Sequence, residues 1–216
     1  MERDAFLARA RTAARAAHLP DVDAGPVSVG PEPDAGDLVE GFVDALGRVG
    51  GVAHRDDPAA VILRLAEAHG VAEYLGWDDA WLPSGLGDAL RDGGLRRIHH
   101  EVPSSAEGRR RHQLGYFDVV LGVTGAEAAF AETGTVVLRS GPGRPRMASL
   151  IPEIHVAILR CDDIHPDLSH WAATPEVALG DAANVVFVTG PSRTGDIEMR
   201  LNVGVHGPRE VHVVLV

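Results

Sequence analysis

Cysteine is almost absent from this 216-residue chain, which contains Cys161 and no other. A single thiol cannot form a disulfide within the chain, and it cannot supply the cysteine ligands of an iron–sulfur cluster or a cysteine-rich zinc site. Cys161 follows an apolar segment and precedes two aspartates, whose negative charge disfavours a thiolate. We therefore interpret Cys161 as a structural residue.

Long apolar runs and basic residues are also scarce. No run approaches the ~20 apolar residues of a membrane span, and the start, MERDAFLARA, is charged and lacks the apolar core of a secretory signal. There are 20 Lys and Arg against 31 Asp and Glu, a net charge of −11. This charge opposes binding to nucleic-acid phosphates. The sequence predicts a cytoplasmic protein with neither a membrane span nor a nucleic-acid partner.

Length and composition are typical of one sizeable soluble domain with an N-terminal appendage. The spacing predicts a helix over Glu2–Ala17, whose alanine-rich face buries little area. His18–Gly36 is rich in proline and glycine and is interpreted as an irregular linker. We therefore divide the chain into an appendage, residues 1–36, and an α/β domain, residues 37–216.

Several further helices are expected in the domain. In Pro58–His69, Asp57 can serve as N-cap, Pro58 occupies the first helical position and Gly70 ends the helix. The other helical segments are Asp37–Val49, Asp79–Asp92, Arg144–Leu150 and Pro166–Ala173.

The expected strands alternate with these helices, which predicts an α/β fold with a mostly parallel sheet. A tight turn at Thr133-Gly134 adds an antiparallel hairpin, so the sheet can be mixed. The runs VVFV and VHVVLV suit strands covered on both faces. The strand segments are Val52–His54, Val71–Trp77, Leu95–His99, Asp118–Val123, Ala128–Ala131, Thr135–Arg139, Ile154–Leu159, Val185–Thr189 and Val211–Val216.

Two loops share the pattern [S/T]-G-P-x-R directly after a strand: Ser140–Arg144 and Thr189–Arg193. Backbone N–H groups, hydroxyls and a guanidinium in such a loop can bind an anion. Ligands of open α/β sheets bind beyond the carboxyl ends of the strands, so we expect Arg144 and Arg193 to line one pocket. The alternative is that each Gly-Pro turns the chain and each arginine faces water.

This predicted anion site takes its clamps from the arginines and its hydroxyls from neighbouring Thr and Ser residues. The candidate ligand-binding residues are Thr135, Ser140, Gly141, Arg144, Arg146, Gly190, Ser192, Arg193 and Thr194.

Glu132 and His206 are the candidate catalytic residues. Glu132 lies beside the predicted turn, where burial can raise the pKa of a carboxyl group for acid–base or nucleophilic work. His206 lies between glycines in GVHGP, which exposes an imidazole that titrates near neutral pH. The structural alternatives are a glutamate that caps backbone amides and a histidine that belongs to a turn.

Signs of a metal or cofactor are missing. No histidine pair has H-x3-H spacing on a clear helix, so we predict no metal site and identify no cofactor. The loops also lack the G-x-x-x-x-G-K pattern, and no Rossmann fingerprint accompanies them. Arg96-Arg97 and Arg109–Arg111 are interpreted as solvated surface charge.

Four segments, taken together and in order, resemble the lactate utilisation protein C (LUD domain) family: Gly122–Leu138, Ser140–Leu159, Gly190–Glu198 and Gly204–Val216. The chain differs mildly from the common pattern: Glu127 replaces Asp, and Gly195 replaces Ala. It also lacks the ferredoxin-like cysteine runs of the related B-type proteins, so the C type is the better match.

The resemblance implies a fold similar to ribose-5-phosphate isomerase, CoA transferases and formyltetrahydrofolate cycloligase. It also implies a role in the oxidation of L-lactate to pyruvate alongside iron–sulfur partner subunits. We expect a non-redox component of that system that binds a small carboxylate or phosphorylated ligand. Two alternatives remain: a stand-alone transferase, isomerase or ATP-dependent ligase of the same fold, and a structural adaptor for an iron–sulfur subunit.

Overall fold

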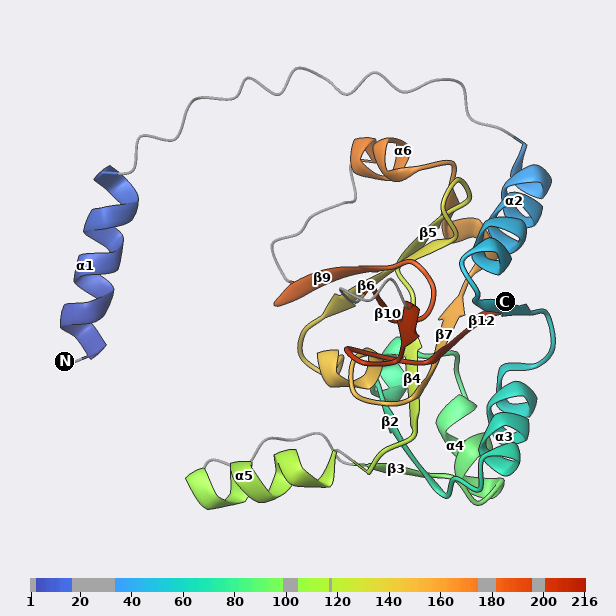
Figure 1. The fold of residues 1–216 in the computed structure, drawn as a ribbon, viewed down its shortest axis with the longest axis horizontal. Coiled ribbons are helices and arrows are strands. Elements are labelled where there is room, and N and C mark those ends of the chain that lie inside the picture. Colours follow the sequence, from blue (N-terminus) through green and yellow to red (C-terminus); the bar gives the residue numbers. More distant parts are fainter. Residues whose placement is uncertain (1–2, 17–33, 99–104, 117, 175–181, 196–200) are drawn as a thin grey trace.

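The computed structural model describes residues 3–16, 34–98, 105–116, 118–174, 182–195 and 201–216. Figure 1 shows the described elements, with α1 drawn apart from the sheets. The α-helices are α1 (Arg3–Ala16), α2 (Ala35–Arg48), α3 (Pro58–Ala68), α4 (Leu86–Asp92), α5 (Ala106–Gly115) and α6 (Leu168–Ala173). The 3-10 helices are η1 (Asp79–Trp81), η2 (Arg146–Ser149) and η3 (Cys161–Asp163).

The described strands form a six-stranded sheet, a four-stranded sheet and a two-stranded pair. The strands are β1 (Val52–His54), β2 (Glu73–Gly76), β3 (Arg96–Ile98), β4 (Leu121–Gly125), β5 (Ala128–Phe130), β6 (Thr135–Ser140), β7 (Ile154–Leu159), β8 (Ile164–His165), β9 (Asn184–Val188), β10 (Arg193–Gly195), β11 (Leu201–Val203) and β12 (Glu210–Leu215).

The six-stranded sheet has the order β1-β12-β7-β4-β2-β3, and every neighbouring pair in it is parallel. The four-stranded sheet has the order β8-β5-β6-β9. Its β5–β6 pair is antiparallel, as the Thr133-Gly134 turn predicts. The α/β fold with a mainly parallel sheet is therefore confirmed.

The prediction of coverage on both faces is right for β12 and wrong for β9. Residues Val211–Leu215 of β12 are buried, because this strand lies between β1 and β7. β9 lies at the edge of the four-stranded sheet, and Phe187 within it remains 47% exposed. Its ring packs against Phe130 and Trp171 in a small aromatic cluster. An apolar run shows that a strand packs, but it does not show how many of its faces are covered.

Helix α3 begins as its sequence predicts: Asp57 accepts a hydrogen bond from the Ala60 amide over 2.9 Å, and Pro58 is the first helical residue. The expected helix Asp79–Asp92 is instead divided into η1 and α4, with Gly85 at φ 80° before α4. Helix α5 was not predicted, because its sequence AEGRRRHQLG has no apolar stripe. Most of the predicted linker lies outside the described residues.

Helix α2 connects the two larger sheets. Its last residues lead into β1, and the β5–β6 turn lies against them. Gly134 adopts φ 66° in this turn, and a Cβ there would collide with the backbone of Ala45 and Leu46. Glycine is therefore needed both for the turn and for the close approach.

His155 is a buried titratable residue in the centre of the six-stranded sheet. Its Nε2 lies 2.9 Å from the Thr124 hydroxyl. Burial, with a smaller contribution from the charge of His212, lowers the pKa of His155 to about 4. The imidazole is therefore neutral in the folded protein at neutral pH.

We expect His155 to make stability depend on pH. The unfolded histidine titrates near its ordinary pKa of 6.5, so between pH 4 and 6.5 the unfolded state binds more protons. Stability is then fully present above pH 6.5 and is lost on acidification, by up to about 3 kcal/mol at pH 4. His155→Gln removes this titration, and urea unfolding at several pH values should show a shallower decline for the variant. Equal declines in the two proteins would contradict this assignment.

Candidate functional site

A cleft of about 460 Å³ lies at the carboxyl edge of the six-stranded sheet. It is reached by the segments that follow β2, β4 and β7, by β6 and by the first Gly-Pro loop. Its lining residues are Trp77, Trp81, Gly125, Ala126, Glu127, Arg139, Arg144 and Asp163. This is the edge at which ligands of open α/β sheets bind. We name it the tryptophan–arginine cleft.

Backbone hydrogen bonds place the segment Trp77–Trp81, which forms one wall of this cleft. The Trp77 amide donates to the Val123 carbonyl over 3.1 Å, which fixes the segment to β4. The Asp78 amide donates to the Gly143 carbonyl over 2.8 Å, which fixes it to the first Gly-Pro loop. The wall is therefore tied to both neighbouring elements of the cleft.

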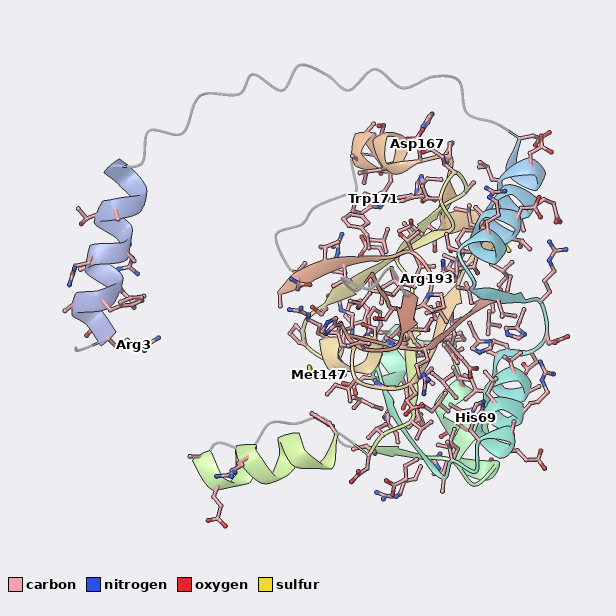
Figure 2. The ribbon with its side chains drawn as sticks, in the orientation of Figure 1. Arg3, His69, Met147, Asp167, Trp171 and Arg193 are labelled. Atoms are coloured by element: carbon pink, nitrogen blue, oxygen red, sulfur yellow. The ribbon has the colours of Figure 1, made fainter. Side chains whose placement is uncertain are left out.

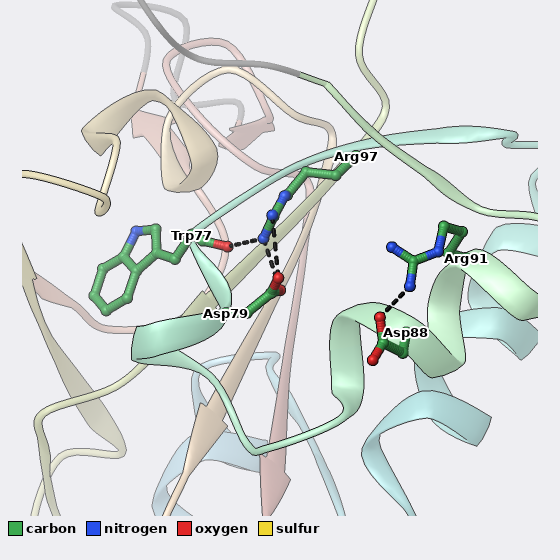
Figure 3. Close-up of polar contacts among 5 residues, drawn as sticks. All are labelled: Trp77, Asp79, Asp88, Arg91 and Arg97. Atoms are coloured by element: carbon green, nitrogen blue, oxygen red, sulfur yellow. Dashed lines mark hydrogen bonds and ion pairs between the residues drawn. The ribbon is translucent and has the colours of Figure 1, made fainter.

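Arg97 ties the same segment from outside the cleft (Figure 3). Its Nη1 donates to the Trp77 carbonyl over 3.0 Å and to Asp79 Oδ1 over 2.8 Å. The interpretation of Arg97 as solvated surface charge is therefore wrong, because its guanidinium also holds the Trp77 carbonyl. Composition does not reveal such a contact to the backbone. Arg96, by contrast, is exposed and pairs with Glu73.

Two glycines allow the tryptophan segment to approach the sheet and the loop. A Cβ on Gly125, at the end of β4, would lie 2.8 Å from the Trp81 carbonyl oxygen. A Cβ on Gly143 would lie 2.8 Å from Asp78 Oδ2 and 3.0 Å from Trp81 Nε1. Gly143 also adopts φ 72°, which disfavours any L side chain.

Arg144 packs its guanidinium on the Trp81 ring, with Cζ 4.0 Å from the ring centre. The tight turn Gly141–Arg144 turns this side chain back into the cleft, and the Arg144 amide donates to the Gly141 carbonyl over 2.9 Å. Arg144 is only 8% exposed. The alternative in which this arginine faces water is therefore wrong.

The cleft contains carboxylates as well as guanidiniums. Arg139, on β6, forms an ion pair with Glu127, the residue directly before β5. Asp163 is partly buried, and burial raises the pKa of its carboxyl group although Arg160, 3.6 Å away, lowers it. Each lining carboxylate therefore has an arginine beside it, which reduces the repulsion of an incoming anion.

The second Gly-Pro loop lies elsewhere, and the prediction of one shared pocket is wrong. Strand β9 pairs antiparallel with β6, with Val188 opposite Val136 and Asn184 opposite Ser140. The chain therefore leaves these two strands at opposite ends. In Figure 2, Arg193 is labelled near the middle of the sheets, and Met147, on η2 after the first loop, is labelled below it and to the left.

Arg193 contacts backbone rather than the tryptophan–arginine cleft. Its Nη2 donates to the Val49 carbonyl at the end of α2, a contact typical of arginines at helix C-termini. Gly190, at φ 75°, also packs closely on Val49. The Ser192 amide donates to the Pro208 carbonyl over 2.8 Å. This loop therefore connects α2 to the segment before β12.

The hydroxyls predicted for the anion site have partners within the fold. The Thr135 hydroxyl lies 2.8 Å from that of Thr189, so it faces the second loop. The Ser140 hydroxyl donates to the Asn184 carbonyl over 3.2 Å. Thr194 lies on β10, and Arg146 is exposed on η2. Their contribution to ligand binding stays a prediction.

Glu132 and His206 lie in different parts of the structure. Glu132 is exposed in the β5–β6 turn, where its amide donates to the Pro166 carbonyl over 3.0 Å. His206 is exposed in a hollow at the amino edge of the six-stranded sheet, and its amide donates to the Ser192 hydroxyl over 3.3 Å. They therefore do not form one catalytic pair, and their individual roles stay predictions.

Sequence reasoning missed much of the tryptophan–arginine cleft: Trp77, Trp81, Glu127, Arg139 and Asp163 were not proposed as site residues. A usable signal existed, because Trp77 is one of three tryptophans and ends a predicted strand.

In the described ranges, no three His, Cys, Asp or Glu side chains form a group suited to a metal ion. The helices of those ranges include none long and apolar enough to cross a membrane.

Replacing Gly143 tests the packing of the loop on Trp81. We expect Gly143→Ala to destabilise the protein by roughly 1–2 kcal/mol through backbone strain and to change tryptophan fluorescence, because the new methyl group displaces Trp81. The control is Gly70→Ala, at φ 64° with nothing within 4 Å of its Cβ. That variant should be similarly strained but keep the native fluorescence. Identical spectra for both variants would count against the packing.

Removing the Arg193 side chain tests its contact with α2. Arg193→Ala should reduce stability by about 1 kcal/mol, which corresponds to about 2–4 °C in Tm for a chain of this size. Arg146→Ala, at an exposed position on η2, should leave Tm unchanged. Thermal unfolding followed by circular dichroism measures both, and equal Tm values for the two variants would show that the contact adds nothing.

Known proteins show the family of the chain. A lactate utilization protein C from Deinococcus radiodurans is 34% identical over 161 residues, 74% of this chain and 68% of that protein. One from an Exiguobacterium species is 43% identical over 100 residues, 44% of each chain. An uncharacterized protein from Neisseria meningitidis is 34% identical over 103 residues, 47% of this chain and 44% of that protein.

The fold is shared with a crystal structure of a DUF162 family protein from Deinococcus radiodurans, with a TM-score of 0.56 at 21% identity, over 85% of this chain and 99% of that one. In the first curated relatives, the match spans about half of their length, 44% and 54%. The LUD domain family matches residues 39–216. Because that match includes both larger sheets and the tryptophan–arginine cleft, the chain belongs to the LUD domain family.

Proposed function

We propose that this protein is a non-redox component of a system that oxidises L-lactate to pyruvate, and that it binds a small anionic ligand in the tryptophan–arginine cleft. The role in lactate utilisation is supported by the curated relatives, several of which are named lactate utilization protein C. The chain itself contains one cysteine, so the electron transfer is assigned to iron–sulfur partner subunits.

The observation that carries ligand binding is the placement of Arg144. The residue is only 8% exposed, yet it lines an open cleft at the sheet edge typical of ligand sites. A carboxylate or phosphate is the chemical group that a guanidinium binds best, through two parallel hydrogen bonds. Arg139 lines the same cleft, and its ion pair with Glu127 neutralises that carboxylate, so the charge of Arg144 is not opposed by it. The ligand is therefore a carboxylate or a phosphorylated compound.

Growth on lactate tests the proposal in the organism that encodes the protein. Deleting the gene should abolish or strongly slow growth on L-lactate as sole carbon source but not on glucose. The wild-type gene and Arg64→Ala, at an exposed position on α3 outside the cleft, should restore growth, whereas Arg144→Ala should fail at equal protein level on an immunoblot. Normal growth of the deletion strain on lactate would refute the role. Full restoration by Arg144→Ala would refute the ligand site.

A further inference from the structure

Trp81 is a large apolar side chain that remains 47% exposed although the segment around it is tightly fixed. Gly125 and Gly143 contact it closely, Arg97 anchors the preceding Trp77, and Arg144 covers part of the ring. The position of the Trp81 side chain is therefore set by these local contacts and not by burial in the core. An exposed indole in a fixed position provides a flat surface on which another ring can stack.

From this arrangement we infer that the ligand of the tryptophan–arginine cleft joins a planar aromatic ring to an anionic group, as a nucleotide does. The inference rests on the anion site proposed above and adds the class of ligand. The anionic group binds beside Arg139 and Arg144, and the ring extends the stack that Arg144 and Trp81 already form. A guanidinium and an indole both stack on heteroaromatic rings.

The size of the cleft supports a ligand larger than lactate. Its volume of about 460 Å³ lies in the range of roughly 300–1,000 Å³ that is typical of pockets for drug-sized molecules. Since a water molecule occupies about 30 Å³, the cleft has room for far more than a three-carbon acid. A ligand as small as lactate would leave both the indole and most of the cleft in contact with water.

The electrostatics of the cleft favour this ligand class as well. Glu127 is paired with Arg139, and Asp163 lies beside Arg160. The carboxylates are therefore compensated, and a phosphate group does not meet an unscreened negative wall. The apolar surface and the positive charge lie side by side on Trp81 and Arg144, which matches a molecule with a ring and an anion joined by a short linker.

Calorimetric titration of the purified full chain tests the inference with four probes: AMP, FMN, ribose 5-phosphate and L-lactate. At least one of the two ring-bearing phosphates should bind about tenfold or more tightly than ribose 5-phosphate and should quench tryptophan fluorescence. Ring-bearing probes that bind no better than ribose 5-phosphate, or no binding by any probe, would overturn the inference.

Variants separate the ring from the anion. Trp81→Ala should abolish the preference for the ring-bearing phosphate over ribose 5-phosphate, and Trp81→Phe should retain part of it. Arg144→Met should weaken binding of both phosphates. Trp171→Phe, in the separate aromatic cluster, is the control and should leave the preference intact. A preference that survives Trp81→Ala in a folded variant, checked by circular dichroism, would refute stacking on Trp81.

Failure of this inference can be distinguished from failure of the proposed function. Binding of ribose 5-phosphate or lactate that is lost in Arg144→Met, without a preference for rings, would refute the ligand class and leave the anion site intact. The role in lactate utilisation is decided by growth on lactate alone.

Discussion

The antiparallel pairing of β6 with β9 determines where the two Gly-Pro loops lie in this protein. The chain leaves two antiparallel neighbouring strands at opposite ends. The two loops of one sequence pattern therefore lie at opposite ends of the β6–β9 pair. Strand β6 also pairs with β5, which directly follows β4. The carboxyl end of β6 is thereby returned to the carboxyl edge of the parallel sheet, where the tryptophan–arginine cleft lies.

The two loops consequently have different roles despite their similar residues. In the first, the turn at Gly143 brings Arg144 onto Trp81. In the second, the turn at Gly190 brings Arg193 onto the end of α2. In both loops a glycine adopts the left-handed backbone conformation, with positive φ. The element packed against each loop decides whether the guanidinium contacts an aromatic ring or a backbone carbonyl. A local motif alone does not distinguish an arginine that packs on an indole in a cleft from one that caps a helix.

Much of the fold could be predicted from the sequence. The cap at Asp57, the proline at Pro58 and the alternation of apolar strands with helices are local signals, and they indicate α3 and the α/β class. The order of the strands could not be predicted, because it depends on contacts between distant segments. That order puts β9 at an edge, separates the two loops and moves Arg97 from the solvated surface to the Trp77 carbonyl.

The candidate site was predicted only in part for the same reason. Arg144 and its loop were recognised, since a guanidinium after a Gly-Pro turn is visible in the sequence. Trp81 and Asp163 follow different strands, and they meet only because β2, β4 and β7 end at one edge. No spacing rule connects such residues. Recognising the rest of the cleft required the three-dimensional arrangement.

The position of β12 between β1 and β7 has a consequence for how the protein is made. The residues of β1 are synthesised early, but β1 joins the six-stranded sheet only through hydrogen bonds to β12, residues 210–215. A nascent chain must therefore be synthesised almost to residue 215 before β1 finds its partner. Until then, the apolar flanks of β7 and the segment around β1 are uncovered. Unpaired strand edges favour aggregation, so this half of the sheet is most exposed to aggregation in the interval before β12 is complete.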